Sequence, residues 1–175
     1  EDISVGDRIL VCNGLLIFEV VAVEGTEIHC TTISGGVMGD KKSMSFPGKV
    51  MRQEYLSEQD KADLLFGIKN GVDFVAASFV RCAQDVIQLR SYLSEMGGEG
   101  IAIISKIENQ QGIDNLDEIL SHCYGVMIAR GDLGVEIAAE KIPLIQKKLI
   151  QRCRARKKPV IVATQMLHSM IENPR

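Results

Sequence analysis

The first 46 residues alternate short apolar, β-branched runs with turn residues. Three such runs cover residues 9–12, 15–23 and 27–33, and Asn13-Gly14 separates the first two. Asn-Gly favours a hairpin turn because both residues tolerate a positive φ angle. Short strands about ten residues apart, joined by turns of this kind, predict a small β-meander or barrel.

After Pro47-Gly48 the pattern changes to apolar strands that alternate with helices. Ser57, followed by Asp60, is typical of a helix N-cap. The expected helices cover residues 57–70, 83–96, 114–121 and 140–156, and the expected strands cover 74–79, 101–107, 125–129 and 159–163. Repeated β-α units predict a parallel sheet with right-handed crossovers. A doubly wound sheet and half of a (β/α)₈ barrel both fit this α/β pattern.

Polar residues gather where each expected parallel strand ends. The four groups lie at residues 78–81, 105–109, 130–134 and 164–166. Parallel α/β folds build their sites at the carboxyl ends of the strands. Helix capping and turn formation explain many residues of this kind, but four strand ends together favour a site.

Lys106 and Glu108 alternate along one strand, so their side chains point to the same side. Lys106 could present a fixed ammonium group to an anion, or it could form a structural ion pair. Glu108 and Asp132 follow neighbouring strands, and two carboxylates placed in this way can bind Mg²⁺ together with substrate oxygens. The alternative for both acids is helix capping.

Three further residues have two interpretations each. Gly131 would let a ligand approach the backbone, and a helix beginning near Leu133 would favour an anion there. Thr164 offers a hydroxyl group at the last strand end, although helix capping is the more common role. Lys42 could reach a nucleotide phosphate or could simply be solvated.

Composition excludes several classes of protein. The 175 residues carry a net charge of −3 without a basic tract, so we expect no nucleic-acid partner. The longest apolar stretch, residues 15–23, is interrupted by Glu19 and is too short to span a bilayer, so we expect no membrane partner. Five cysteines without a paired spacing are typical of reduced thiols, which favours a cytoplasmic location. A chain that starts at Glu1 and stops after Asn-Pro-Arg is expected to be part of a longer protein.

Three long motifs resemble pyruvate kinases. They are Ile-Ile-Ser-Lys-Ile-Glu-Asn at 103–109, Met-Ile-Ala-Arg-Gly-Asp-Leu-Gly-Val-Glu-Ile at 127–137, and Ala-Thr-Gln-Met-Leu at 163–167 followed by Ser-Met-Ile at 169–171. Residues 77–81 and 39–42 match more loosely. The resemblance implies a TIM (β/α)₈ barrel, of which residues 49–175 would supply about strands 4–7. Residues 1–48 would be the second half of an all-β cap domain.

The resemblance also implies a reaction, the transfer of a phosphoryl group from phosphoenolpyruvate to ADP, which gives pyruvate and ATP. Lys106 would stabilise the transferred phosphoryl group and the enolate. Glu108 and Asp132 would hold Mg²⁺ or Mn²⁺. Such chemistry depends on positioning and charge neutralisation, which a lysine and a divalent cation supply.

The remaining implied roles concern substrate binding. The backbone N–H groups of Gly131 and Asp132 would bind the substrate carboxylate, and Thr164 would contact the substrate near the proton delivered to the enol carbon. Lys42 would reach the nucleotide phosphates. The family further implies a K⁺ site whose ligands lie outside these residues, and a homotetramer.

The cap departs from the family pattern at Cys12-Asn13, where Asp-Asp is usual, and at Ser43 and Ser45. Nucleotide–metal contacts there are in doubt, which supports one alternative, a diverged and non-catalytic paralogue. A second alternative is a magnesium-dependent lyase or aldolase acting on pyruvate enolates. We expect the 175-residue chain to be inactive by itself, because about half of a barrel would be missing.

Overall fold

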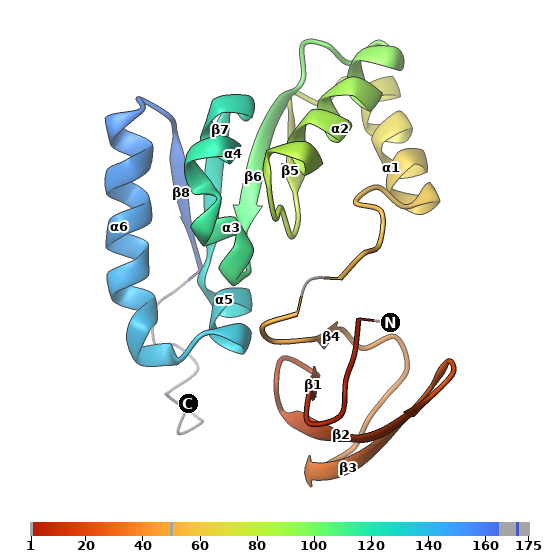
Figure 1. The fold of residues 1–175 in the computed structure, drawn as a ribbon. Coiled ribbons are helices and arrows are strands. Elements are labelled where there is room, and N and C mark those ends of the chain that lie inside the picture. The colour runs from red at the N-terminus through yellow and green to blue at the C-terminus, as the bar shows by residue number, and fades with distance from the viewer. Residues whose placement is uncertain (1, 50, 165–170, 172–175) are drawn as a thin grey trace.

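A computed structural model describes residues 2–49, 51–164 and 171 (Figure 1). It contains two separate four-stranded sheets. The parts of the last motif at residues 165–167 and 169–170 lie outside the described residues.

The N-terminal sheet is antiparallel and has the strand order β3-β2-β1-β4. Its strands are β1 Arg8–Val11, β2 Leu16–Glu24, β3 Glu27–Ser34 and β4 Met44–Ser45. Asn13 and Gly14 have φ angles of 56° and 82°, as the Asn-Gly signal predicts, and the N–H of Leu15 donates to the carbonyl of Cys12 at 3.2 Å. A small core of four buried side chains holds this sheet together, and these are Ile9, Val11, Leu16 and Val20.

The second sheet is parallel and has the order β5-β6-β7-β8. Its strands are β5 Phe74–Ala77, β6 Ala102–Ile107, β7 Gly125–Ala129 and β8 Val160–Ala163, and its longer helices are α1 Glu58–Lys69, α2 Ala83–Glu95, α4 Leu116–His122 and α6 Ile142–Ala155. Consecutive helices pack on each other, α1 on α2, α2 on α4 and α4 on α6 (Figure 1). One continuous layer of helices is the arrangement of a barrel, whereas a doubly wound sheet places helices on both faces.

The parallel sheet is open within the described residues, because β5 and β8 each have one neighbour. Apolar side chains on these edge strands are exposed, among them Phe74 at 56% and Ile161 at 44%. Open edges of this kind invite pairing with further strands. The arrangement agrees with the expectation of a partial barrel.

Two boundaries differ from the sequence-based expectation. The strand expected to reach residue 79 ends at Ala77, because Phe79 adopts a positive φ of 51° that interrupts the extended backbone. The helix expected near Leu133 begins three residues earlier, as α5 Arg130–Glu136, directly after β7.

Two other helical regions also differ. The helix expected over residues 114–121 is α4, and a short helix that was not expected, α3 Gln110–Asp114, precedes it, with Asn115 between them. Residues 139–155 form a short 3₁₀ turn, η1 Ala139–Lys141, followed by α6. Pro143 stands in the first turn of α6, where its missing N–H removes no intrahelical hydrogen bond.

Ser57 caps α1 as predicted, and Ser57→Ala is expected to lower the free energy of unfolding by about 1 kcal/mol. The Ser57 hydroxyl accepts from the N–H of Asp60 at 3.1 Å, and the Asp60 carboxylate accepts from the N–H of Ser57 at 2.9 Å. Urea unfolding followed by circular dichroism measures the change. Ser91→Ala, on an exposed site within α2, is the control, and equal effects of the two variants would contradict the cap.

None of the helices in the described part of the chain is both long and apolar enough to cross a membrane.

Candidate active site

Lys106 and Glu108 lie side by side at the carboxyl end of β6. The Nζ atom of Lys106 is 2.8 Å from Oε1 of Glu108, and it donates to the Oγ atom of Ser78 at 2.9 Å. The ion pair considered as an alternative from the sequence is therefore present. Because Ser78 follows the neighbouring strand β5, the ammonium group is fixed between two strand ends.

Glu108 is buried, with 1% of its surface exposed, and the N–H of Phe79 donates to its carboxylate. Burial raises the pKa of Glu108, and a hydrogen bond with the Asp132 carboxyl raises it further, whereas Lys106 and the Phe79 N–H lower it. The structure thus brings Glu108 and Asp132 together, as the sequence predicted.

The buried carboxyl group of Glu108 and the half-buried one of Asp132 are suited to a shared cation, because a cation relieves their mutual repulsion. Among the described residues no group of three or more His, Cys, Asp or Glu side chains forms a metal site. Two carboxylates would suit Mg²⁺, which takes one or two protein carboxylates and completes its coordination with substrate oxygens and water.

Gly131 and Asp132 lie in the first turn of α5, where backbone N–H groups have no intrahelical acceptor. Apart from its chain neighbours and the backbone of its own helix, a Cβ atom added at Gly131 would meet no atom within 4 Å. The chain itself therefore does not require glycine at this position, and the space beside the backbone is open.

Arg130 links the ends of β7 and β8, a role that the sequence reasoning missed. Its guanidinium donates to the backbone carbonyls of Ala163, at 3.2 Å, and of Thr164, and to the side-chain oxygen of Gln146 at 3.1 Å. Thr164 itself is exposed at the end of β8. The alternative that Thr164 caps a following helix concerns residues 165–170, which lie outside those described. For the role of Arg130, the sequence signal was an arginine that directly follows a buried strand.

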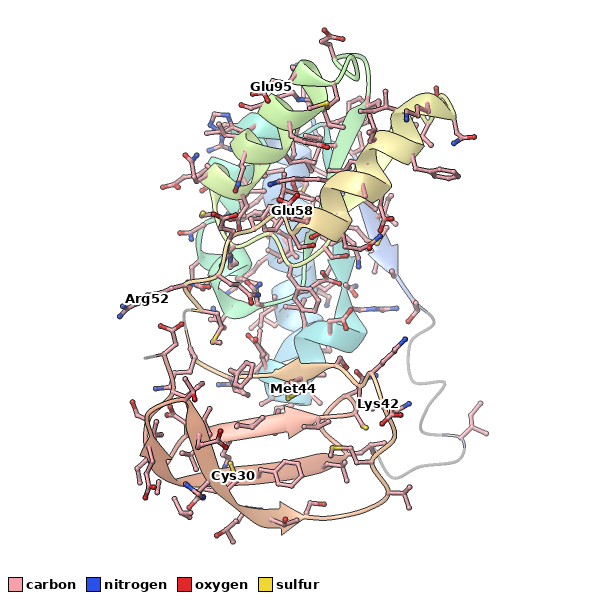
Figure 2. All side chains as sticks on the ribbon, turned by 90° about the vertical axis from the view of Figure 1, so that its right-hand side faces the viewer. Cys30, Lys42, Met44, Arg52, Glu58 and Glu95 are labelled. Carbon is pink, nitrogen blue, oxygen red and sulfur yellow. The ribbon has the colours of Figure 1, made fainter. Side chains whose placement is uncertain are left out.

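Lys42 is not joined to the strand-end residues. It is exposed on the loop before β4 (Figure 2), and no hydrogen bond or ion pair within the described ranges connects it to Lys106, Glu108 or Asp132. Its neighbour Ser43 contacts the hairpin turn, since the Ser43 carbonyl accepts from the N–H of Cys12 at 3.3 Å and the Ser43 hydroxyl donates to the Asn13 side chain at 3.4 Å. Two of the departures from the family pattern are therefore in mutual contact.

The N-terminal sheet stands beside the polar strand ends. A Cβ atom added at Gly14, in the hairpin turn, would lie 4.0 Å from the side chain of Val135 on α5. A cleft extends from β4 along residues 51–56 to Ser78 and Phe79. Ser78 and Phe79 line this cleft, whereas Lys106, Glu108 and Asp132 do not, so the cleft lies beside these three side chains.

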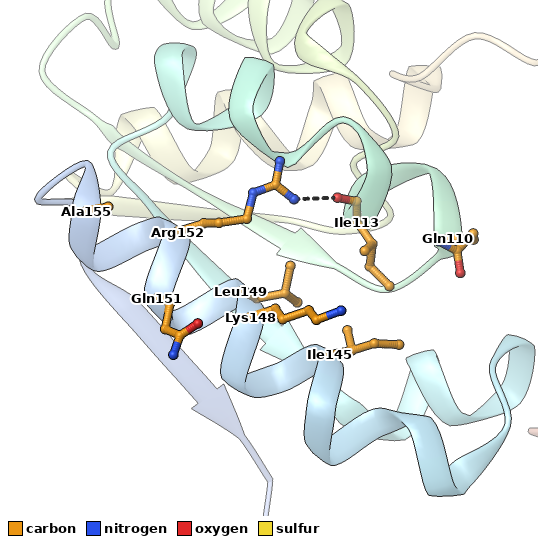
Figure 3. Close-up of a pocket in the computed structure, with 8 residues that line it drawn as sticks. All are labelled: Gln110, Ile113, Ile145, Lys148, Leu149, Gln151, Arg152 and Ala155. Carbon is orange, nitrogen blue, oxygen red and sulfur yellow. Dashed lines mark hydrogen bonds between the residues drawn. The ribbon is translucent and has the colours of Figure 1, made fainter.

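A separate hollow lies on the helical side of the parallel sheet, between α3 and α6 (Figure 3). Ile113, Leu149 and Arg152 contribute to it, and Arg152 donates to the carbonyl of Ile113 at 3.3 Å. It contains none of the site residues predicted from the sequence.

Comparisons with known proteins agree with the resemblance. The family model "Pyruvate kinase, barrel domain" matches residues 1–175. The chain is 52% identical to the pyruvate kinase of Geobacillus stearothermophilus over 177 positions, covering all of this chain and 30% of that protein. It is 48% identical to the pyruvate kinase of Clostridium acetobutylicum, covering all of this chain and 37% of that protein. The pyruvate kinase of Dictyostelium discoideum is 46% identical and is covered to 35%. The chain thus spans about a third of the length of these curated relatives.

Proposed function

Since the chain belongs to the pyruvate kinase family, we propose that the whole protein transfers the phosphoryl group of phosphoenolpyruvate to ADP, giving pyruvate and ATP. The observation that carries the proposal is the cluster at the strand ends. One ammonium group and two carboxyl groups meet there, at the ends of adjacent parallel strands of a chain that matches the barrel domain throughout.

Lys106 is the group that faces the negative charge of the reaction. Its ammonium is already held by Ser78 and Glu108, so little reorganisation is needed when charge develops on the phosphoryl oxygens and on the enolate. A fixed cation that meets charge as it develops favours the transition state over the bound substrate.

Glu108 and Asp132 would hold Mg²⁺ or Mn²⁺. When bound, this cation supplies positive charge that neutralises the phosphoryl and enolate oxygens. The N–H of Phe79 and the ammonium of Lys106 orient the Glu108 carboxylate and favour its charged form.

The substrate carboxylate would accept hydrogen bonds from the N–H groups of Gly131 and Asp132, on the open side of α5. Thr164, whose backbone is held by Arg130, would contact the substrate near the carbon that receives a proton. These assignments use backbone donors for the carboxylate and keep the ammonium of Lys106 for the phosphoryl group.

Lys42 would bind the nucleotide phosphates after the N-terminal sheet, residues 1–48 in our domain division, moves toward the strand ends. Closure of this sheet would also exclude water, so that the phosphoryl group reaches ADP and is not hydrolysed. We further propose a K⁺ requirement with ligands outside residues 1–175, a homotetrameric assembly and a cytoplasmic location.

The test is a measurement of pyruvate and ATP formation by the whole protein from phosphoenolpyruvate and ADP, with Mg²⁺ and K⁺. We expect turnover by the whole protein and none above background by the 175-residue chain alone, because within the described part of the chain β5 and β8 expose unpaired edges. Turnover by the isolated chain would contradict the second expectation. Absence of turnover in the whole protein would contradict the proposed function and favour a non-catalytic paralogue.

A further inference from the structure

The segment between the two sheets forms hydrogen bonds in both directions through three consecutive residues, Met51, Arg52 and Gln53. We call residues 51–56 the connector. On the side of the N-terminal sheet, the Asp2 carboxylate accepts from the N–H of Arg52 at 3.1 Å and pairs with its guanidinium at 3.2 Å. On the side of the parallel sheet, Nη1 of Arg81 donates to the carbonyls of Met51 at 3.0 Å and Gln53 at 3.5 Å. Any change in the angle between the sheets must therefore act on these residues.

Arg81 is itself rigidly held. Its Nε and Nη2 atoms donate to the two carboxylate oxygens of Asp85 at 3.1 Å and 2.9 Å, and Asp85 is only 4% exposed. Its guanidinium carbon lies 5.9 Å from the centre of the Tyr55 ring. Such a bidentate ion pair fixes the plane of the guanidinium group and directs Nη1 toward the connector.

The loop that ends in Arg81 also orients the candidate active site. Ser78 accepts from Lys106, and Phe79 donates its N–H to Glu108. The Tyr55 hydroxyl of the connector donates to the carbonyl of Ser78 at 2.8 Å. Burial raises the pKa of Tyr55, so its hydroxyl stays protonated and remains a donor.

The φ of 51° at Phe79 shows that this loop is constrained. A bulky residue adopts a positive φ only where its surroundings impose it. Here the conformation turns the Phe79 N–H toward Glu108, and Arg81, two residues later, is fixed by Asp85. A shift at Arg81 is therefore transmitted along a short, constrained backbone to the groups that hold Lys106 and Glu108.

We infer that Arg81 is a positioning residue that couples the orientation of the N-terminal sheet to the geometry of Lys106 and Glu108. It acts through the connector on one side and through Ser78 and Phe79 on the other. The inference rests on the proposed phosphoryl transfer, in which a closing N-terminal sheet and a correctly placed Lys106 are needed at the same moment. No role for Arg81 followed from the sequence pattern.

The test compares Arg81→Lys with Arg90→Lys in the whole protein. Arg90 is a matched control, because it is also half-buried and donates to two backbone carbonyls, of Ile101 at 2.7 Å and Glu99 at 3.4 Å, but at the amino end of β6. Lysine at position 81 keeps the charge beside Asp85 but cannot reach Asp85 and the connector together. We expect kcat to fall about tenfold or more in Arg81→Lys, with KM for phosphoenolpyruvate nearly unchanged, because misplaced groups weaken transition-state stabilisation.

A second readout does not depend on activity. Dyes on unnatural keto residues at positions 30 and 95 report the distance between the N-terminal sheet and the far end of α2 (Figure 2), and both positions are exposed. We expect a broader distance distribution in Arg81→Lys, a smaller broadening in Asp85→Asn, and the wild-type distribution in Arg90→Lys. A residue with a merely local structural role would not change this distance.

Each outcome decides one claim. An unchanged distance distribution in Arg81→Lys, or a fall in kcat no larger than that of Arg90→Lys, overturns the inference and leaves the kinase function standing. A higher KM with an unchanged kcat also overturns it. A wild-type protein without turnover overturns the proposed function instead, and the distance distribution alone then decides whether Arg81 fixes the connector.

Discussion

Replacement of Lys106 by methionine is expected to reduce the turnover of the whole protein by about 10²- to 10³-fold, as does the loss of one preorganised donor in other active sites. The ammonium group is fixed at the strand ends, 2.8 Å from Oε1 of Glu108 and 2.9 Å from Oγ of Ser78. Methionine keeps a chain of similar length and removes the charge. The initial rate of pyruvate formation at saturating substrates measures the effect.

Lys158→Met is the control for this variant. Lys158 is also partly buried and donates to the carbonyl of Cys123 at 2.7 Å, but it precedes β8 and so stands at the opposite end of the parallel sheet. We expect a small loss of stability and nearly full turnover. Equal losses of turnover in the two variants would show that the effect comes from folding and would remove Lys106 from the reaction.

Replacement of Glu108 by glutamine is expected to reduce turnover by about 10²-fold or more and to weaken the binding of Mn²⁺, used as a spectroscopic probe of the Mg²⁺ site. Glutamine has nearly the same shape, but it removes the negative charge that Lys106 and the Phe79 N–H stabilise. A divalent cation would then meet only the carboxylate of Asp132. Electron paramagnetic resonance of bound Mn²⁺ measures the affinity independently of turnover.

Glu136→Gln is the matched control. Burial also raises the pKa of Glu136, and its carboxylate accepts from the N–H of Gln110 at 3.3 Å, a bond that an amide oxygen can keep. We expect Mn²⁺ affinity close to that of the unaltered protein. Mn²⁺ binding that survives in Glu108→Gln, or that falls equally in Glu136→Gln, would contradict the assignment of Glu108 as a ligand.

Much of the fold could be predicted because the relevant signals are local. The Asn13-Gly14 turn, the Ser57 cap and the strand Gly125–Ala129 each depend on a few neighbouring residues, and each is present where the pattern indicated. One boundary that was wrong has a non-local cause. The early end of β5 follows from the conformation of Phe79, whose N–H bonds to Glu108, a residue 29 positions away.

The alternation of strands and helices could not distinguish a doubly wound sheet from part of a barrel. That choice depends on which helices pack against each other, and packing between distant segments leaves no periodic trace in the chain. The contacts of α1 with α2, α2 with α4 and α4 with α6 decided it.

The sequence alone determined which chemical groups stand at the strand ends, because parallel strands bring their carboxyl ends to one edge whatever the details of packing. Lys106, Glu108 and Asp132 were identified in this way, and the three motifs of the chain indicated its family. Only the tertiary structure decided what holds those groups. Ser78 and Phe79 orient Lys106 and Glu108, Arg130 ties β7 to β8, and Arg81 joins the same loop to the connector. These contacts link residues about 28 to 33 positions apart, and most of them involve a backbone atom, which every residue carries. For both reasons no residue pattern could reveal them.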